Sequence, residues 1–455
     1  MSISANIQTL QNGDILIFNK PKVNNISNQL KSLCIAGNNR DIKYILSNDD
    51  LSDIFPNISI VPYDNLNSVI DQYYNNIYQN QHKIKYYIGV TGSYGKSSVC
   101  YFLHQLLNQI SHNMSCLISS IGTGTNTLSQ AAHLTTPDYG SILDTFYANK
   151  DNSDFGILEV SSHAVEYNRI GNIKFDISVF TSYSPDNHHF HIQQGDKYLK
   201  YKQDFFTKGK IKIGNNIPFP EYIQCQYSYD DIYFYIDQYK IPYNIINNQY
   251  LPKIHKENIG MSLYILYNIY KLGYLNKYFD NICISFQDII DKININNIQL
   301  PSGRSVHLCT DNYNIIIDGA HSANTIKSLL ESLNKSTIFM FGVLNDYNKY
   351  PFILDIFNII NNHHMVEELV ITTDGSFGVI DEKLLYELSD KLHKSIVIYD
   401  RFQAIEYSIN KSNSHNNIVI AGKSTEAKIQ IKYPGYIIFY EEEEIVKYFV
   451  NKKYY

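Results

Sequence analysis

The sequence lacks the features that mark several classes of protein. It has no tryptophan, and its six cysteines are scattered without a Cys-x-x-Cys pair. Such cysteines are typical of buried thiols in a reducing compartment, not of a disulfide framework or a zinc site. Residues 1–17 are polar and lack the basic-then-apolar pattern of a secretory signal. No run approaches the roughly 20 apolar residues that a membrane-spanning helix needs. We therefore expect a soluble, cytoplasmic protein.

Strong charge of either sign is also missing. The formal net charge is -6 over 455 residues, whereas a broad nucleic-acid surface needs clustered basic charge. We expect neither a nucleic-acid nor a membrane partner, and we expect a monomer. The chain is long enough for about two to four domains, and a hydrophobic content of 44% is sufficient for buried cores.

Short apolar runs alternate with helical stretches along most of the chain, which predicts an α/β fold with parallel sheets. Two features suggest domain boundaries: a polar linker at residues 79–82 and, later in the chain, Pro301. The expected parts are a small mixed α/β unit (1–83), a central unit (84–299) and a last unit that repeats the α/β rhythm (300–455). The spacing also predicts a helix over 254–272 and a weaker helix over 284–298.

One stretch organises the sequence. Residues 86–90 form an apolar run typical of a strand, residues 91–98 read TGSYGKSS, and an apolar-periodic helix follows. In this order, glycines let backbone N–H groups close around phosphate oxygens, and the helix N-terminus favours negative charge. Lys96 would reach the terminal phosphates, and Ser97 or Ser98 would hold Mg²⁺. Val90 stands where GxxxxGK[ST] has its first glycine, so a plain strand–turn–helix joint is the alternative.

Two further stretches carry candidate metal ligands. Glu159 ends an apolar run downstream of the phosphate loop, where a second Mg²⁺ ligand is needed. Residues 188–191 contain three histidines, which favour either a metal cluster or a polar active-site loop with one useful histidine. Mg²⁺ prefers oxygen ligands, and a zinc site would need more widely spaced ligands.

Seven motifs in order resemble those of the Mur ligase family. They are residues 89–98, 135–138 (TTPD), 159–163 (EVSSH), 180–191, 303–304 (GR), 318–321 (DGAH) and 421–426 (AGKSTE). The most similar type is UDP-N-acetylmuramoyl-dipeptide ligase, which forms the tripeptide in peptidoglycan precursor synthesis. The match runs from about Val61 to the C-terminus, and the first 60 residues resemble that type only loosely.

The resemblance implies a fold and a reaction. The fold would comprise a shortened N-terminal domain for the UDP-substrate, a central P-loop ATPase domain and a C-terminal Rossmann-like domain for the incoming amino acid. ATP would phosphorylate a carboxylate on the acceptor, and the amine would then attack the acyl phosphate to give an amide, ADP and phosphate. Cations around the transferred phosphate are what such a step requires.

The resemblance also assigns roles to individual residues. Catalytic roles fall on Lys96, Glu159 and Lys202, where Lys202 matches a carbamylated lysine whose alternative is an exposed helix lysine. ATP would be bound by Thr91, Gly92, Gly95, Lys96, Ser97, Ser98, Asn258, Arg304, Asp318 and His321. Substrates would be bound by Thr135, Thr136, Ser161, Arg169, Asp374, Gly422 and Glu426. Mg²⁺ would be bound by Ser97, Glu159 and His188.

The sequence departs from the family pattern at four places. Asn187 replaces the metal histidine, so a one-residue shift to His188 is needed. Tyr347 stands where arginine is frequent, and His255 replaces an asparagine of the adenine segment. The Asp-Asn-Pro-Arg element that selects diaminopimelate is absent from residues 373–377. Bidentate recognition of a carboxylate requires an arginine, so the sequence does not support diaminopimelate as the incoming amino acid.

Three hypotheses follow. The leading one is a Mur-type ligase that uses ATP and Mg²⁺ to add an amino acid to a UDP-muramoyl peptide or a similar carboxylate. The second is a folylpolyglutamate- or cyanophycin-type ligase, with which residues 342–348 and 318–321 are compatible. The third is a degenerate, non-catalytic binding protein, suggested by Asn187 and by the shortened N-terminal unit.

Overall fold

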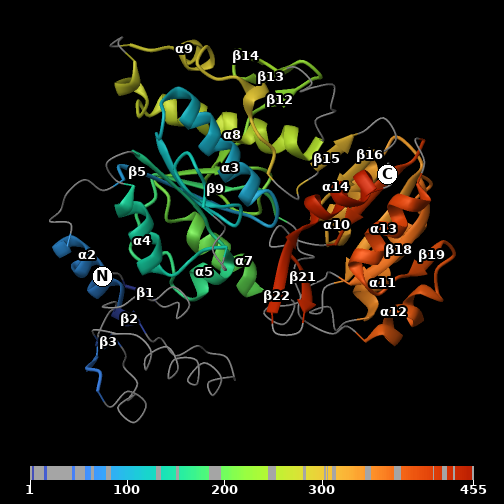
Figure 1. Ribbon diagram of the computed structural model, residues 1–455. Helices are drawn as coiled ribbons and strands as arrows, with labels where there is room; N and C mark the ends of the chain where they lie inside the picture. Colours follow the sequence, from blue (N-terminus) through green and yellow to red (C-terminus); the bar gives the residue numbers. More distant parts are fainter. Residues whose placement is uncertain are drawn as a thin grey trace. The chain divides into compact units, whose positions relative to one another are not determined.

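Figure 1 shows the computed structural model of the chain. The structure describes residues 3–4, 15–17, 44–46, 57–62, 66–77, 84–129, 135–149, 153–183, 196–243, 253–279, 283–301, 304, 306–309, 314–343, 350–373, 381–412, 415–422, 428–433 and 436–452. The chain divides into two compact units. The first comprises Met1–Tyr183, Asp196–Gln226 and Met261–Ile293, and the second comprises Ser184–Gly195, Tyr227–Gly260 and Asn294–Tyr455. The three-domain division at residues 83 and 299 stays a prediction.

A seven-stranded sheet forms the core of the first unit, in the order β11-β10-β9-β5-β8-β6-β7. Its strands are β5 (Tyr86–Thr91), β6 (Ser115–Ile118), β7 (Thr123–Gly124), β8 (Phe155–Glu159), β9 (Ile177–Phe180), β10 (Ile211–Gly214) and β11 (Ile223–Gln224). Every neighbouring pair is parallel except β6 and β7. Since β5 pairs with β8 on one side and β9 on the other, the carboxyl ends of these three strands meet at one edge.

Helices of the first unit follow these strands. They are α3 (Lys96–Ile110), α4 (Tyr139–Ala148), α5 (Ser162–Glu166), α7 (Asp196–Phe206), the later part of α8 (Lys253–Lys271), the 3-10 turn η2 (Asn276–Tyr278) and α9 (Phe286–Ile290). Helix α3 forms because its apolar residues recur three and four positions apart, and Val99, Phe102, Leu103 and Leu106 are fully buried.

The N-terminal segments add a small parallel sheet to the first unit. Its strands are β1 (Ile3–Ser4), β2 (Ile15–Ile17), β3 (Tyr44–Leu46) and β4 (Ile60–Val61). Helix α2 (Leu66–Ile77) follows and packs on α4. The Tyr74 ring stacks on Tyr147 with centroids 5.4 Å apart, and the Tyr74 hydroxyl donates to the Gly140 carbonyl at 3.0 Å.

A six-stranded sheet forms the core of the second unit, in the order β15-β16-β20-β17-β18-β19. Its strands are β15 (Val306–Cys309), β16 (Asn314–Ile317), β17 (Thr337–Val343), β18 (Val366–Thr373), β19 (Ser395–Val397) and β20 (Asn417–Ala421). Only the β15–β16 pair is antiparallel. The strand side chains alternate between two apolar clusters: Ile316 packs with α10 (Ala323–Glu331), α11 (Tyr350–Asn361) and α12 (Glu382–Ser389). Ile315 and Ile317 pack with α13 (Arg401–Lys411) and α14 (Glu442–Lys452).

Two antiparallel sheets complete the second unit. One is β12 (Ser228–Tyr229), β13 (Tyr233–Ile236) and β14 (Tyr239–Pro242), and the other is β21 (Lys428–Tyr433) and β22 (Tyr436–Glu441). The predicted α/β fold with parallel sheets is confirmed.

The predicted helix over 284–298 is wrong as a continuous element. Helix α9 begins with a capping box at Ser285 and Asp288 and ends after Ile290, and a separate 3-10 turn, η3, covers Ile295–Asn297. The Asn294 side chain accepts a hydrogen bond from the backbone N–H of Asn296, which starts this second turn independently.

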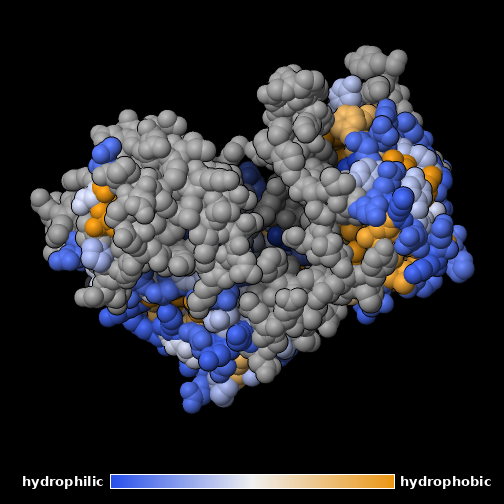
Figure 2. Space-filling view, turned by 90° about the horizontal axis from the view of Figure 1, so that it is seen from below, coloured by the Kyte–Doolittle hydropathy of each residue, from blue (hydrophilic) through white to orange (hydrophobic). Residues whose placement is uncertain are grey.

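On the face shown in Figure 2, the coloured residues are mostly hydrophilic, with hydrophobic residues in small areas between them. Among the described residues, the structure has no helix that combines the length and the apolar character needed to span a membrane.

Candidate active site

The loop between β5 and α3 is shaped by glycine. Gly92 has a φ of 144° and Gly95 a φ of 80°, conformations that side chains disfavour. A Cβ atom on Gly92 would lie 2.1 Å from the Thr181 hydroxyl oxygen. Residues after β9 hold the loop: the Ser93 backbone N–H donates to the Ser182 carbonyl at 2.7 Å, and the Thr181 hydroxyl donates to the Tyr94 carbonyl. The loop is therefore packed tightly against the end of the neighbouring strand.

Glu159 lies at the end of β8, directly opposite the start of α3. It is 1% exposed, and its Oε1 accepts a hydrogen bond from the Ser97 hydroxyl at 2.8 Å. Its Oε2 accepts from the backbone N–H of Ser120 at 2.9 Å and from the Ser120 hydroxyl at 3.0 Å. Since charge-assisted hydrogen bonds are strong, this network fixes the carboxylate beside the Ser97 hydroxyl. Ser98 is also buried, but the hydroxyl that faces Glu159 is that of Ser97.

Two lysines converge on one carbonyl oxygen of the loop. Lys96 Nζ donates to the Gly92 carbonyl at 3.1 Å and to the Ser93 carbonyl at 3.4 Å. Lys202 Nζ, from α7, donates to the same Gly92 carbonyl at 2.6 Å. The ammonium group of Lys96 places positive potential at the loop, and an anion such as a phosphate is the natural partner for it.

Lys202 is 2% exposed, so the alternative of an exposed helix lysine is wrong. Burial lowers the pKa of Lys202 well below its usual value, and the charge of Lys96 lowers it further, whereas Glu159 acts in the opposite direction. The Tyr198 ring lies against the ammonium, with Nζ 4.5 Å from its centroid. Lys202 therefore loses its proton and becomes a neutral amine at a lower pH than an exposed lysine does.

The backbone of Glu159 is tied to the next group of predicted residues. The Thr136 hydroxyl donates to the Glu159 carbonyl at 2.8 Å and accepts from the Ser161 backbone N–H at 3.0 Å. Arg169 Nη1 donates to the Thr136 carbonyl at 3.3 Å. The structure thus brings together Thr136, Ser161 and Arg169, with Thr135 adjacent in sequence, next to the carboxyl end of β8.

The predicted adenine segment lies in the second unit, at the start of α8. His255 Nε2 lies 2.7 Å from the Arg304 carbonyl oxygen, and Asn258 is buried one turn further along the helix. Lys256 Nζ pairs with Asp231 Oδ1 at 3.2 Å, from the turn between β12 and β13.

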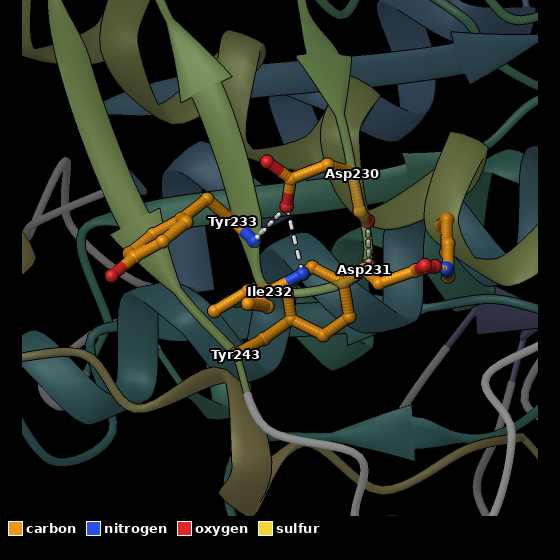
Figure 3. A network of polar contacts seen from close by, with 6 residues as sticks. Asp230, Asp231, Ile232, Tyr233 and Tyr243 are labelled. Atoms are coloured by element: carbon orange, nitrogen blue, oxygen red, sulfur yellow. Dashed lines mark hydrogen bonds and ion pairs between the residues drawn. The ribbon is translucent and has the colours of Figure 1, made fainter.

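That turn is held by Asp230 (Figure 3), whose carboxylate accepts from the backbone N–H groups of Ile232 and Tyr233 at 2.7 Å each. A small sheet therefore supports the first turn of α8.

The predicted DGAH motif and Gly422 meet at the carboxyl ends of β16 and β20. The Asp318 carboxylate accepts from the Ala320 backbone N–H at 2.7 Å, which closes a tight turn. His321 Nδ1 lies 2.7 Å from the Gly319 carbonyl oxygen. The Gly422 backbone N–H donates to the Ala320 carbonyl at 2.9 Å, and its φ of 82° suits glycine.

Some predicted residues lie outside the described residues. They are His188, Asp374 and Glu426, together with the departures Asn187 and Tyr347. Within the described ranges, no group of three or more His, Cys, Asp or Glu residues could hold a metal ion.

Sequence reasoning missed Ser120, whose only sequence signal is a hydroxyl residue just after an apolar run, which is common outside active sites too. It placed Thr181 and Ser182 in the motif at 180–191 but gave them no role.

Several known proteins are similar to this chain. Residues 90–217 match the model of the Mur ligase middle domain, a range that contains Lys96, Glu159 and Lys202. A UDP-N-acetylmuramoyl-L-alanyl-D-glutamate–2,6-diaminopimelate ligase of Caldanaerobacter subterraneus subsp. tengcongensis is 23% identical over 435 residues, covering 89% of this chain and 86% of the relative. The enzyme of that name from Buchnera aphidicola subsp. Schizaphis graminum is 27% identical over 441 residues, covering 87% and 84%.

Solved structures share the fold. The crystal structure of the MurF ligase from Thermotoga maritima in complex with ADP has a TM-score of 0.60 at 12% identity, over 99% of this chain and 97% of that chain. Residues 90–217 thus match the Mur ligase middle domain, the two ligases are similar to this chain over more than four fifths of its length, and the MurF ligase shares its fold.

Proposed function

We propose that this chain forms an amide bond between an amino acid and a UDP-N-acetylmuramoyl-peptide, or a similar carboxylate, at the expense of ATP. The observation that carries the proposal is the convergence of Lys96 and Lys202 on the Gly92 carbonyl, beside the Ser97–Glu159 pair. Phosphoryl transfer between two anions is slow without cations around the transferred group. At this place Lys96 supplies a cation, and Glu159 supplies a carboxylate for a metal.

The residues present suit Mg²⁺. The Ser97 hydroxyl and the Glu159 carboxylate are hard oxygen donors 2.8 Å apart, which is the donor type that Mg²⁺ selects. When bound, Mg²⁺ would neutralise charge on the phosphates of ATP. The buried Thr91 hydroxyl oxygen has no hydrogen-bond partner within the described ranges, which leaves it available to a ligand at the loop.

The proposed reaction has two steps. In the first, a carboxylate oxygen of the acceptor attacks the γ-phosphorus of ATP, which forms an acyl phosphate, and ADP leaves with the electrons of the broken bond. The neutral amine of the amino acid then attacks the acyl carbon, the amine loses a proton, and inorganic phosphate leaves. Lys96 would stabilise the phosphate oxygens in the first step, because backbone and ammonium donors positioned in advance need no reorganisation.

Roles for the remaining residues follow the family resemblance. Thr135, Thr136, Ser161 and Arg169 would hold the acceptor. Asn258, Arg304, Asp318 and His321 would hold the nucleotide, and Asp374, Gly422 and Glu426 would hold the amino acid. His188 would be a further metal ligand. Residues 1–83 would serve the UDP moiety, residues 84–299 the ATP, and residues 300–455 the amino acid.

Lys202 would act as a carbamate. Its neutral amine attacks the carbon of CO₂ and loses a proton, which gives an anionic group where the uncharged amine was. The low pKa of Lys202 supports this step, because only the neutral amine is nucleophilic.

The relatives are named for diaminopimelate, but the amino acid of this chain is to be found by assay. Residues 373–377, in the place of the selecting element, supply no arginine.

The test measures amide formation and phosphate release together. Wild type and Lys96→Ala are given Mg-ATP, UDP-muramoyl-dipeptide and pooled amino acids, and the products are analysed by mass spectrometry. We expect an acceptor- and amine-dependent release of phosphate with a new amide mass, lost in Lys96→Ala and kept in Lys208→Ala, an exposed lysine after α7. If no amide forms with this acceptor, with tetrahydrofolate and glutamate, or with related carboxylates, the proposal fails.

A further inference from the structure

A buried cation lies at the carboxyl edge of the sheet in the second unit. Arg401 is the first residue of α13, and only 2% of it is exposed. Its helix is capped by the Asp400 side chain, which accepts from the Gln403 backbone N–H at 2.8 Å. Arginine is among the residues least often fully buried, because its desolvation is costly unless its donors are used. The position of its guanidinium therefore has a structural or functional reason.

The guanidinium joins the ends of three strands that are neighbours in the sheet. Nη1 donates to the Thr373 carbonyl, the last residue of β18, at 3.3 Å. Nη2 donates to the Ala421 carbonyl, the last residue of β20, at 3.3 Å. Strand β17 runs between them, and a Cβ atom on its Gly342 would lie 2.1 Å from Nη1. Only a residue without a side chain leaves room there for the guanidinium.

Gly342 and Gly422, which lie on this edge of the sheet, are also in close contact. A Cβ atom on Gly422, whose φ is 82°, would lie 2.2 Å from the Gly342 carbonyl oxygen. Gly342, Thr373 and Gly422 thus lie at the ends of three parallel strands or one residue from them, and Arg401 contacts or directly adjoins each of them. Ligands of open α/β sheets bind at such carboxyl ends.

We propose that Arg401 is a positioning residue for the incoming amino acid: it fixes the strand ends at Gly342, Thr373 and Gly422 from which the amino-acid site is built. The inference rests on the proposed ligase function, and it assigns a role to a residue that no family motif identified. Gly422 is itself a predicted substrate residue, and residues 374 and 426 follow two of these strand ends in the sequence.

The bridge depends on the two Nη atoms of the planar guanidinium. Two separate Nη atoms reach two carbonyl oxygens on strands that are not adjacent, and they do so around the backbone of a third strand. A lysine offers one nitrogen on a flexible stem and cannot serve both carbonyls in a fixed plane. Arg401→Lys therefore keeps the charge but loses the bridge.

The kinetic test compares Arg401→Lys and Arg401→Gln with wild type and with Lys411→Gln. Lys411 lies on the same helix, is 46% exposed and pairs with Glu368, so it controls for the loss of a cation from α13. We expect both Arg401 variants to raise the KM for the amino acid roughly tenfold or more, with the KM for ATP within about twofold of wild type. Lys411→Gln should match wild type. Equal changes in both KM values, or no change in Arg401→Lys, would overturn the inference.

A second measurement does not depend on ligase activity. Hydrogen exchange of the full chain reports opening at the strand ends, and we expect Arg401→Lys to speed exchange in peptides that contain 342–343, 373 and 422, but not in those of α10. Unchanged exchange at the strand ends contradicts the bridge even if Arg401→Gln does not fold. If wild type forms no amide, the proposed function fails, while faster exchange in Arg401→Lys still supports the anchoring of the strand ends.

Discussion

Replacing Gly92 by alanine tests whether the loop between β5 and α3 depends on the close contact with Thr181. The φ of 144° at Gly92 is nearly exclusive to glycine, and a side chain there costs about 1–3 kcal/mol. The new Cβ atom would also lie 2.1 Å from the Thr181 hydroxyl oxygen. Thr181 would have to move, and its single hydroxyl proton, which lies within reach of the Thr91 and Tyr94 carbonyls, would lose a hydrogen bond worth about 1 kcal/mol. The expected loss in the free energy of unfolding is about 2–4 kcal/mol.

The assay is urea denaturation, with ATP binding measured by titration calorimetry under conditions where both proteins are folded. ATP affinity should fall as well, because the Gly92 carbonyl orients both Lys96 and Lys202. Gly273→Ala is the matched control: its φ is 73°, but its nearest neighbour, Asn276 Nδ2, lies 3.4 Å from the new Cβ. It measures backbone strain alone, about 1–2 kcal/mol.

Thr181→Ala provides the second control. In the Gly92→Ala background it removes the clashing oxygen, so the double variant should regain part of the lost stability. The reasoning is refuted if Gly92→Ala costs no more than Gly273→Ala, or if Thr181→Ala restores nothing.

Three further predictions concern the same unit. Ser97→Ala should raise the Mg²⁺ concentration needed for half-maximal activity about tenfold or more, whereas Ser98→Ala should not; equal effects in a metal titration would contradict the assignment. Burial lowers the pKa of His104 to about 4, against about 6.5 unfolded. The unfolded chain therefore binds the proton first, and the free energy of unfolding should fall by up to about 3 kcal/mol between pH 6.5 and 4. Urea denaturation across this range should show a smaller fall in His104→Gln; an equal fall excludes His104. Ligase activity should depend on bicarbonate and be lost in Lys202→Arg but kept in Lys200→Arg; a rate that ignores bicarbonate argues against the carbamate.

Local pattern was enough to predict much of the central unit. The strand predicted over 177–180 is β9 at its observed bounds, and the helix predicted over 254–272 differs from α8 by one residue at each end. These segments have continuous apolar runs or clear helical spacing, which are local properties. The turn that starts at Thr91 and the carboxylate of Glu159 were placed at strand ends for the same reason, and β5 and β8 end at these two residues; their binding roles stay a prediction.

The contacts that assemble the site were not predictable in this way. Lys202 reaches Gly92 across 110 positions of sequence, and Ser120 reaches Glu159 across 39. Arg401 has no local signal, because its importance comes from strand ends that are 28 and 20 residues away. The failure at 284–298 has the opposite cause: the apolar spacing is helical, but capping by Ser285 and Asn294 divides the segment into two turns.

The hydrogen bonds of Glu159 have one further consequence, which concerns the affinities of two substrates. Its carboxylate is bound to Ser97 and Ser120, while its backbone carbonyl is bound to Thr136, which in turn contacts Ser161 and Arg169. A nucleotide–metal complex that moves the carboxylate therefore acts on the same residue as an acceptor that moves Thr136. Coupling between two ligands is reciprocal, so each must change the affinity of the other by the same factor. We expect the two substrates of this enzyme to bind with a measurable linkage, and Thr136→Val to uncouple them.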